Sequence, residues 1–464
     1  MWKVKVEITL TDDEYTEEGK EIQVQIEESI PDGFQDLDQW ESNVHNLGFR
    51  SMRELFKQGI ELFEEKILSE YTHEDGNCQT ERRGFREFTL RAVFGKVTFP
   101  RQRIYCKTCG EWVIPINEAL GLHDDEQERA TIGFKELSCL HAVHHPYRSA
   151  VEKIEQSTRD PQIVSHEQIR QIVQEEGRRV REREEEERKD AVFCFIKALQ
   201  NGQFYRPHDG RFYICLDGIL VRSSSGRGRY HEGKVGFICT DEREPAGRRL
   251  KIPIKRYISS FESSYVLGGR VRGEALKMAI RLYREVFIIG DGARWIRKVR
   301  YLCFPGTIYI LDWYHLHDNL CEALRLTLPY EASRRKAIHR KVSKYFWRGS
   351  KRKALAELEL LHSQLLVEGK QKRLEQRRGL NEFIDYIQNN REGIVNYREM
   401  YKAGYLVASS LAEKAADLVV AKRQKKHQGM HWTRIGADNL SALRTLWLNG
   451  DWEEYWRERR DKAA

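Results

Sequence analysis

Three short apolar runs that each end at an aspartate constrain the fold of this chain more than any other feature. Residues 212–216, 286–290 and 307–311 are followed by Asp217, Asp291 and Asp312. Short apolar runs are typical of buried strands, so we expect three carboxylates at the ends of neighbouring strands. Clustered carboxylates favour a site for hard divalent cations. The alternative for the two aspartates that precede glycine is an ordinary turn.

The composition predicts a globular protein of two or three domains, because 464 residues with 40% hydrophobic content are enough for sizeable cores. No run of about 18 apolar residues occurs, and the alternating start at residues 1–8 is unlike a signal peptide. The nine cysteines are scattered and odd in number, which argues against a disulfide framework. We therefore expect a cytoplasmic protein with no membrane partner.

The N-terminal part of the chain has strand patterns and one metal-binding motif. Residues 1–30 alternate like a hairpin, 51–71 have the spacing of an amphipathic helix, and 87–103 alternate as a second hairpin. The second hairpin leads to Cys106 and Cys109. Their Cys-x2-Cys-Gly spacing is typical of a knuckle that offers two thiolates to one tetrahedral zinc ion.

A zinc site of this kind needs four ligands. His73 and Cys78 could complete the set with Cys106 and Cys109, although their spacing is unusual. The alternative is a small β unit without a metal.

Residues 126–200 have a helical pattern. Short helices are expected at 137–143, 149–156 and 165–175, separated by breaks at prolines. This layout predicts a helix-turn-helix module whose last helix presents Arg170 to DNA; a helical linker without DNA contacts is the alternative. The charged stretch that follows is expected to be an exposed helical connector.

The next segment predicts an α/β unit. Strands are expected at residues 212–216, 234–240, 250–257, 286–289 and 307–311, with a helix at 273–285. Three strands, a helix, and then strand, helix, strand is the order of an RNase H-like core. The predicted fold class is therefore α+β and multidomain, with an RNase H-like α/β catalytic core after a small N-terminal β unit and a helical DNA-binding region.

Residues 315–399 are helical in pattern and would interrupt the core as an all-helical insertion. Between residues 331 and 380 the chain has 15 Lys and Arg against 5 Glu. Such an excess fits binding to the phosphate backbone of DNA, and a solvated helical face is the alternative. The expected DNA contacts are Arg334, Arg335, Lys336, Arg340, Lys341 and Lys344.

Asp217 and Asp291 should lie side by side, because the first and fourth strands of an RNase H-like core are adjacent. Carboxylates that bridge two divalent metal ions, about 4 Å apart, can promote cleavage of a phosphodiester. A third carboxylate should come from a late helix, where Glu413 stands among small residues that allow close packing against the sheet. Asp417, one turn later on the same face, is the alternative.

Six short blocks follow one another along the chain, at residues 217–218, 231–236, 290–296, 304–306, 311–315 and 429–432. In content and order they resemble bacterial insertion-sequence DDE transposases of the Kra type, which are related to Mutator-like transposases. The resemblance spans roughly residues 85–456. It implies a triad of Asp217, Asp291 and Glu413 that binds two Mg²⁺ or Mn²⁺ ions, with Asp312 and His315 as an accessory pair. Relatives often carry two Cys-x2-Cys knuckles, whereas this chain has one.

The accessory pair has two interpretations. An Asp312–His315 hydrogen bond would orient the ring toward DNA, and a helix cap formed by Asp312 is the alternative. Trp295 and Trp432 could stack on unpaired bases, although core packing is favoured for Trp295. Basic residues after the Glu413 helix would hold phosphates beside the active site. These are Lys422, Arg423, Lys425, Lys426 and Arg434.

The predicted function is that of a DDE transposase, which cleaves DNA at the ends of its own element and joins the freed 3′-hydroxyl to target DNA. The expected partners are double-stranded DNA, both terminal inverted repeats and target, and further copies of the chain in a homodimer or higher oligomer. The expected location is the bacterial nucleoid. An RNase H-like nuclease that cuts without joining, and an inactive transposase-derived DNA-binding protein, are the alternatives.

Six segments are expected along the chain. They are an N-terminal strand and helix region at 1–72, the small β unit at 73–125, the helical region and charged linker at 126–205, the first part of the core at 206–314, the basic insertion at 315–400 and the rest of the core at 401–464.

Overall fold

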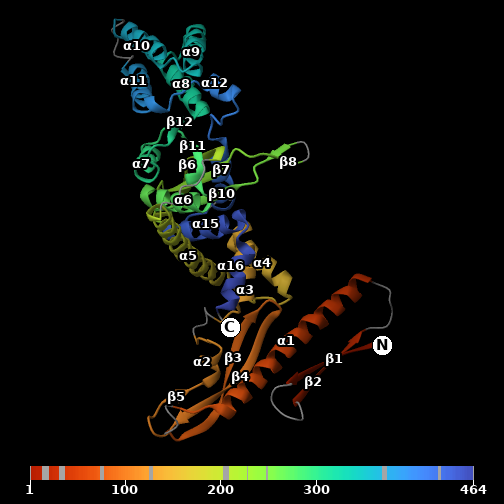
Figure 1. The fold of residues 1–464 in the computed structure, drawn as a ribbon. Coiled ribbons are helices and arrows are strands. Elements are labelled where there is room, and N and C mark those ends of the chain that lie inside the picture. The colour runs from red at the N-terminus through yellow and green to blue at the C-terminus, as the bar shows by residue number, and fades with distance from the viewer. Residues whose placement is uncertain are drawn as a thin grey trace. The chain divides into compact units, whose positions relative to one another are not determined.

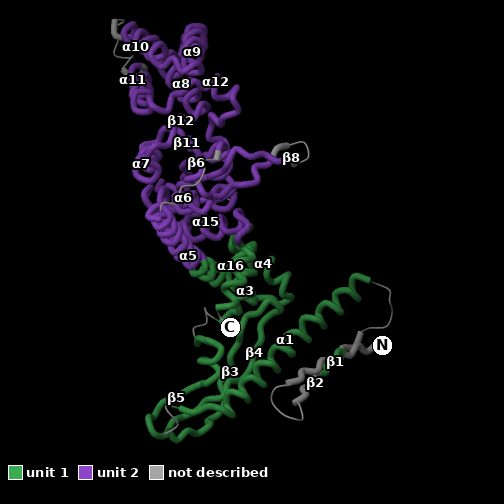
Figure 2. Tube along the Cα trace, in the orientation of Figure 1, with its two compact units in different colours: residues 1–176, 452–464 green, residues 177–451 purple. Residues whose placement is uncertain are grey.

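The computed structural model describes residues 2–12, 20–30, 37–73, 78–124, 129–201, 208–226, 228–246, 249–367, 374–426 and 430–462. Gly429, in the last of the sequence blocks, lies outside them. The chain is mixed α+β and divides into two compact units, residues 1–176 with 452–464 (unit 1) and residues 177–451 (unit 2), which Figure 2 colours separately. The finer six-segment division stays a prediction. No described helix is long and apolar enough to cross a membrane.

Unit 1 begins with the predicted hairpin, in which β1 (Trp2–Asp12) and β2 (Lys20–Ile30) pair antiparallel. The predicted amphipathic helix is also present, but α1 (Leu37–Glu70) begins earlier than expected. A second antiparallel sheet contains β3 (Thr80–Ala92), β4 (Gly95–Cys106) and β5 (Trp112–Val113). Helix α1 runs along β4 (Figure 1), and Ile60 packs with Phe88 and Phe99 in their shared core.

The rest of unit 1 is helical. It contains α2 (Pro115–Ala119), α3 (Ile132–His144), α4 (Tyr147–Thr158), the first part of α5 (His166–Gln200) and α16 (Trp452–Asp461). The three helices predicted in this region are confirmed. Ser165 begins α5 with a capping box, since its Oγ accepts the Gln168 N–H at 3.2 Å and its own N–H donates to Gln168 Oε1 at 3.0 Å. Ile169 is buried and Arg170 is exposed, as the pattern predicts.

Unit 2 is built on one five-stranded sheet. Its order is β10 (Lys255–Ser260), β7 (Tyr230–Thr240), β6 (His208–Arg222), β11 (Tyr283–Gly290) and β12 (Ile308–Leu311). Strand β7 is antiparallel to β6 and β10, whereas β6, β11 and β12 are parallel. The strand predicted at 250–257 is wrong as a single element. It is divided between β9 (Arg249–Lys251), which pairs with β8 (Glu244–Ala246), and β10, because Pro253 has no N–H to donate to a ladder.

One face of the sheet is covered by α6 (Ser264–Lys277) and α7 (Arg294–Cys303). Ile214 and Ile288 of the sheet pack there against Leu267 and Val299. The helix predicted at 273–285 is displaced, because Ser263 accepts the Val266 N–H and begins α6 earlier. A 3-10 turn (Ile280–Leu282) and then β11 occupy the end of the predicted range.

The remaining elements of unit 2 are helices. Between β12 and α13 lie α8 (Trp313–Thr327), α9 (Ala332–Trp347), α10 (Lys351–Val367), α11 (Leu374–Asn389), a 3-10 turn (Arg391–Gly393) and α12 (Tyr397–Lys402). After them come α13 (Ser410–Ala416), a π turn (Asp417–Ala421), α14 (Lys422–Gln424) and α15 (Arg434–Asn449). The helical pattern predicted for 315–399 is thus present. Helix α13 packs against β6 and β7, and α15 packs against β10.

Candidate functional site

Asp217 and Asp291 lie at equivalent positions on adjacent parallel strands. Cys215 of β6 pairs with Ile289 of β11, and each aspartate follows two residues later. Asp217 lies within β6, whereas Asp291 lies just beyond the end of β11. The register therefore brings the two carboxylates to neighbouring positions, as the apolar runs in the sequence predict.

Asp291 also makes the turn that the sequence left open as its alternative role. Its Oδ1 accepts the Ala293 N–H at 2.9 Å. Gly292 has a φ of +92°, and a Cβ there would lie 2.7 Å from the ring of Tyr386 and 2.8 Å from the amide of Asn390. The Tyr386 hydroxyl donates to the Asp291 carbonyl at 2.7 Å. The turn thus holds Asp291 firmly in place at the edge of the sheet.

Asp217 is a half-buried carboxyl with acidic neighbours. Burial is the main cause that raises its pKa to about 6; the Gly218 N–H that it accepts at 2.8 Å and nearby His315 act to lower the pKa, and the negative charges of Asp291 and Glu413 act to raise it. A carboxyl in this state gains from a nearby divalent cation, which would favour its charged form.

Glu413 reaches the same region from α13. Ala412 and Ala415 are fully buried, which permits the close contact of α13 with β6 and β7 that the sequence predicts. The Glu413 side chain is half exposed, and its Oε1 lies 3.2 Å from Nε2 of His315. Asp417, the alternative, instead forms an ion pair with Lys426 at 2.6 Å. The geometry therefore favours Glu413.

Asp312 is a buried helix cap. Its Oδ1 accepts the backbone N–H of His315 at 2.9 Å, and its Oδ2 accepts the N–H of Ser409. The cap interpretation is therefore confirmed, and the ring of His315 contacts Glu413. Ligand-capable atoms of Asp312, His315 and Glu413 all lie within 4.8 Å of one another.

The structure also reveals a basic pocket that the sequence reading missed. A cavity of about 530 Å³ lies between α7 and the end of α11. Its cationic lining residues are Arg294, Arg297, Lys298, Arg300 and Arg391. Arg300 is paired with Glu392 at 2.8 Å. Four of these cations lie within nine residues after Asp291, and this local basic cluster could have predicted the pocket. The cluster is not continuous, because the buried residues Ile296 and Val299 lie between its members.

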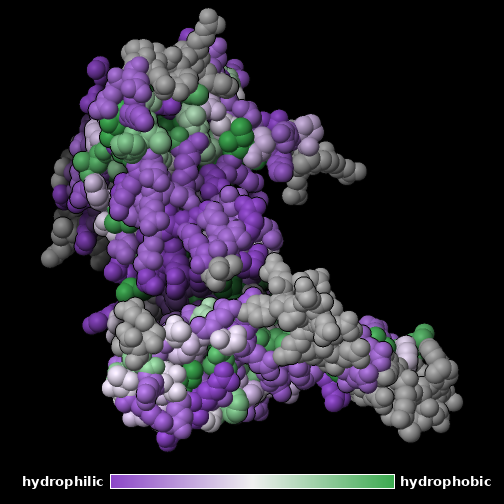
Figure 3. Space-filling view, turned by 60° about the horizontal axis from the view of Figure 1, so that its bottom comes forward, coloured by the Kyte–Doolittle hydropathy of each residue, from purple (hydrophilic) through white to green (hydrophobic). Residues whose placement is uncertain are grey.

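The predicted basic residues of α9 fall into two groups. Lys336, Arg340 and Lys344 are exposed and four residues apart, so they form one stripe along the helix, here called the α9 stripe. The others contact residues of the same unit. Arg334 donates to Glu331 and Gln364, Arg335 donates to the Leu328 carbonyl, and Lys341 pairs with Glu357. Hydrophilic side chains cover much of the face drawn in Figure 3.

The basic residues after Glu413 are also divided. Lys422 and Lys425 are exposed, and Arg434 is exposed but paired with Glu262 at 3.0 Å. Arg423, in contrast, is 1% exposed, with its guanidinium over the ring of Trp432. It is therefore part of the core and is no surface contact for DNA.

The two tryptophans both pack in unit 2. Trp432 is 7% exposed, and its indole N–H donates to the Gln424 carbonyl at 3.0 Å, so the base-stacking prediction is wrong for this residue. Trp295 packs against the core of the sheet. The predicted zinc ligands Cys106 and Cys109 lie in unit 1, beside His73 and Cys78.

The chain belongs to the uncharacterised protein family UPF0236, which matches residues 32–460. The UPF0236 protein in the vanSb 3′ region of Streptococcus gallolyticus is 25% identical over 434 residues, which cover 91% of this chain and 85% of that protein. Among solved structures, the Drosophila P element transposase strand transfer complex matches 73% of this chain and 99% of that chain, at 11% identity and a TM-score of 0.28. A TM-score of this size does not indicate a shared fold. The finer resemblance to Kra-type and Mutator-like transposases stays a prediction.

Proposed function

We propose that this member of the UPF0236 family is a DDE transposase, which cleaves DNA at the ends of its own element and joins the freed 3′-hydroxyl to target DNA. One observation supports the proposal: Asp217 and Asp291 hold equivalent positions on adjacent parallel strands, Glu413 lies on α13, which packs against β6 and β7, and burial raises the pKa of Asp217. Among the described residues, no Lys or Arg forms an ion pair with Asp217 or Asp291. A carboxyl whose pKa is strongly shifted by burial and by neighbouring charges is a candidate for a functional site.

The strand order supports an RNase H-like core for unit 2. In the order β10, β7, β6, β11, β12, only β7 runs against the others. This is the arrangement expected when three strands and a helix are followed by strand, helix and strand. Helices α8 to α12 then form an insertion between the fifth strand and the helix that carries Glu413.

The donor set fits hard divalent cations. Three carboxylates provide oxygen ligands, which Mg²⁺ and Mn²⁺ prefer. Two such ions, when bound, would activate the attacking oxygen and stabilise the leaving oxygen of a phosphodiester. The chain itself fixes Asp291 through its turn, and Nε2 of His315 lies 3.2 Å from a carboxylate oxygen of Glu413.

Exposed cations would bind the DNA backbone. The α9 stripe presents three cations, and the basic pocket adds the guanidinium groups that follow Asp291. Contacts of this kind position DNA without reading its sequence. We propose that both surfaces contact the phosphate backbone of the DNA.

The triad is tested with duplex DNA that carries the element ends and with Mg²⁺. Asp291→Asn and Glu413→Gln are expected to bind these ends as the wild type does and to lose cleavage. Asp417→Asn, four residues from Glu413, is the matched control and should keep cleavage. Cleavage by Glu413→Gln at the wild-type rate would overturn the triad assignment.

Pre-cleaved ends separate the proposed activity from its alternatives. A transposase joins them to a target plasmid, whereas an RNase H-like nuclease gives no joined product. If the protein binds the ends but neither cuts nor joins them with Mg²⁺ or Mn²⁺, it is a transposase-derived DNA-binding protein.

A further inference from the structure

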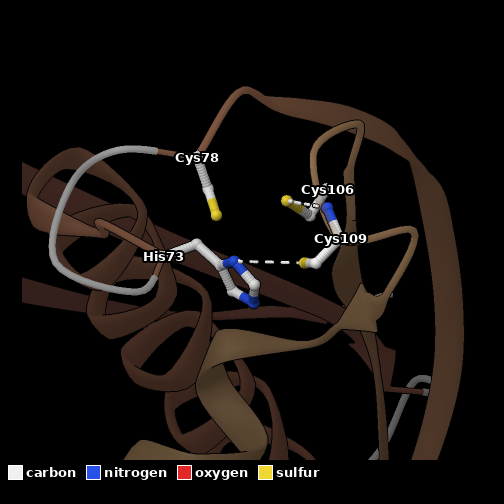
Figure 4. Close-up of side chains that lie close together, drawn as sticks. All are labelled: His73, Cys78, Cys106 and Cys109. Atoms are coloured by element: carbon white, nitrogen blue, oxygen red, sulfur yellow. Dashed lines mark hydrogen bonds between the residues drawn. The ribbon is translucent and has the colours of Figure 1, made fainter.

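Four side chains with metal-binding atoms gather where three segments of unit 1 meet (Figure 4). His73 follows α1, Cys78 precedes β3, Cys106 ends β4, and Cys109 lies in the turn between β4 and β5. Their ligand atoms all lie within 4.8 Å of one another. We propose that His73, Cys78, Cys106 and Cys109 form a structural zinc site. The proposal is independent of the proposed catalysis.

The strand register explains how Cys78 reaches the knuckle. Thr80 of β3 pairs with Cys106 of β4, so the residues just before β3 lie beside the β4–β5 turn. Gln79 fixes this contact, because its carbonyl accepts the Lys107 N–H at 2.8 Å and its N–H donates to Thr108 Oγ1 at 3.0 Å. A long hairpin thus brings together two cysteines that are far apart in the sequence.

The backbone of the turn has the form that a zinc knuckle requires. The Gly110 N–H donates to the Cys106 carbonyl at 2.9 Å, and Gly110 has a φ of +77°, which favours glycine. The Cys109 N–H points to Sγ of Cys106 at 3.5 Å. An N–H directed at sulfur favours the thiolate, which is the form of cysteine that binds metals.

His73 is oriented as a metal-binding histidine. Its side chain is 8% exposed, and its Nδ1 lies 3.8 Å from Sγ of Cys109. On the other side of the ring, Nε2 lies 3.9 Å from a carboxylate oxygen of Glu111. Histidines that bind metals commonly direct their second nitrogen to a carboxylate, which fixes the ring and raises its basicity.

The dimensions and the number of ligands indicate a closed zinc site. With Zn–S bonds of about 2.3 Å, the sulfurs of a tetrahedral site are roughly 3.8 Å apart, so a small contraction of this cluster would accommodate the ion. None of the nine cysteines forms a disulfide. Four protein ligands leave no position for water or substrate, so the ion would join the end of α1 to the β3–β4–β5 sheet and would have no catalytic role.

The metal content of the purified full-length protein tests the site. We expect about one zinc ion per chain by mass spectrometry. After the metal is removed with a chelator and Co²⁺ is added, we expect the intense visible bands of tetrahedral cobalt and a thiolate-to-cobalt charge-transfer band. This measurement needs no variant. Absence of bound zinc together with absence of these bands would overturn the proposal.

Variants assign the ion to this cluster. Cys106→Ser combined with Cys109→Ser should lose the zinc and the cobalt bands, whereas Cys194→Ser, at an exposed cysteine, should keep both. His317, Cys321 and His339 form another group of possible ligands in unit 2. If zinc is lost in His339→Ala and retained in the double cysteine variant, the ion belongs to that group and the proposal is wrong.

Discussion

Two clusters of charged side chains in unit 2 use their carboxylates in opposite ways. On α15, the Asp438 carboxylate accepts a hydrogen bond from Arg181 at 3.0 Å, and Arg270 lies 3.5 Å away. At the edge of the sheet, the half-buried Asp217 has Asp291 and Glu413 as its acidic neighbours. The first cluster contains arginines as counter-charges, whereas the basic side chain of the second is His315, which lies 3.2 Å from Glu413.

The pKa values follow this difference. Burial acts to raise the pKa of Asp438, but the charges of Arg181 and Arg270 outweigh it and leave the pKa below the usual range. Burial raises the pKa of Asp217 to about 6, and neighbouring acids add to the effect. Removing a buried acid that pairs with internal cations leaves those cations uncompensated, whereas an acid beside other acids costs stability and is suited to a ligand.

The largest effect on stability is expected from Asp438→Asn. The change leaves Arg181 and Arg270, in a buried place, with Glu184 as their remaining shared carboxylate, which should lower the free energy of unfolding by about 3–5 kcal/mol. Urea denaturation measures it. Asp417→Asn, which removes the exposed pair with Lys426, is the control and should cost less than about 1 kcal/mol. Equal losses of unfolding free energy in the two variants would show that the buried cluster stabilises the fold no more than the exposed ion pair does.

Asp217→Asn should raise the free energy of unfolding, in contrast to Asp438→Asn. The folded pKa of about 6 lies above the unfolded value, so the contribution of Asp217 to stability is present at low pH and is lost as the pH rises through 6. Without metal at pH 8, the variant should therefore be more stable than the wild type by at most about 3 kcal/mol. The gain should shrink as the pH is lowered toward 4. Destabilisation at pH 8 would contradict the contrast with Asp438.

Mg²⁺ should supply the missing counter-charge. At a concentration tenfold above its Kd, the ion should stabilise the wild type by about 1.4 kcal/mol, and a thermal melt at pH 8 measures this. The effect should weaken at pH 5.5, where Asp217 is largely protonated, and should be absent in Asp217→Asn. The same stabilisation in that variant would place the ion elsewhere.

The smallest change in stability is expected at the α9 stripe, because none of its three cations forms an ion pair with a described residue. Replacing Lys336, Arg340 and Lys344 by Ala should change stability by less than about 0.5 kcal/mol. It should reduce the salt dependence of DNA binding by about one unit of slope for each lost phosphate contact. Lys341→Ala, at a position paired with Glu357, is the control with a smaller effect. An unchanged slope would show that the stripe is a solvated helical face that does not contact DNA.

Local patterns predicted β6, β7, β11 and β12 of the sheet; Asp291 and Asp312 follow the ends of their strands as expected, whereas β6 continues past Asp217 to Arg222. An apolar run of strand length is itself a sign of burial, and the aspartate that follows the run can be read directly from the sequence. Asp217 and Asp291 could therefore be predicted without knowledge of the fold. The Ser165 cap and the buried face of α5 were visible for the same reason. The stretch from Arg178 to Lys189 is helical as expected, and Arg178 and Lys189 are exposed. Its predicted exposure is wrong for Arg181, which is buried because its partner Asp438 lies 257 residues away in the sequence.

Contacts between distant segments decided the remaining assignments. The sequence left Asp312 open between two roles, and the N–H groups of His315 and Ser409 make it a cap. Arg423 is as basic as its neighbours, yet its place against Trp432 removes it from the surface. Cys78 joins the knuckle through the register of a long hairpin. In each case the role depends on which groups surround the side chain, and burial and pairing are properties of the neighbours rather than of the residue.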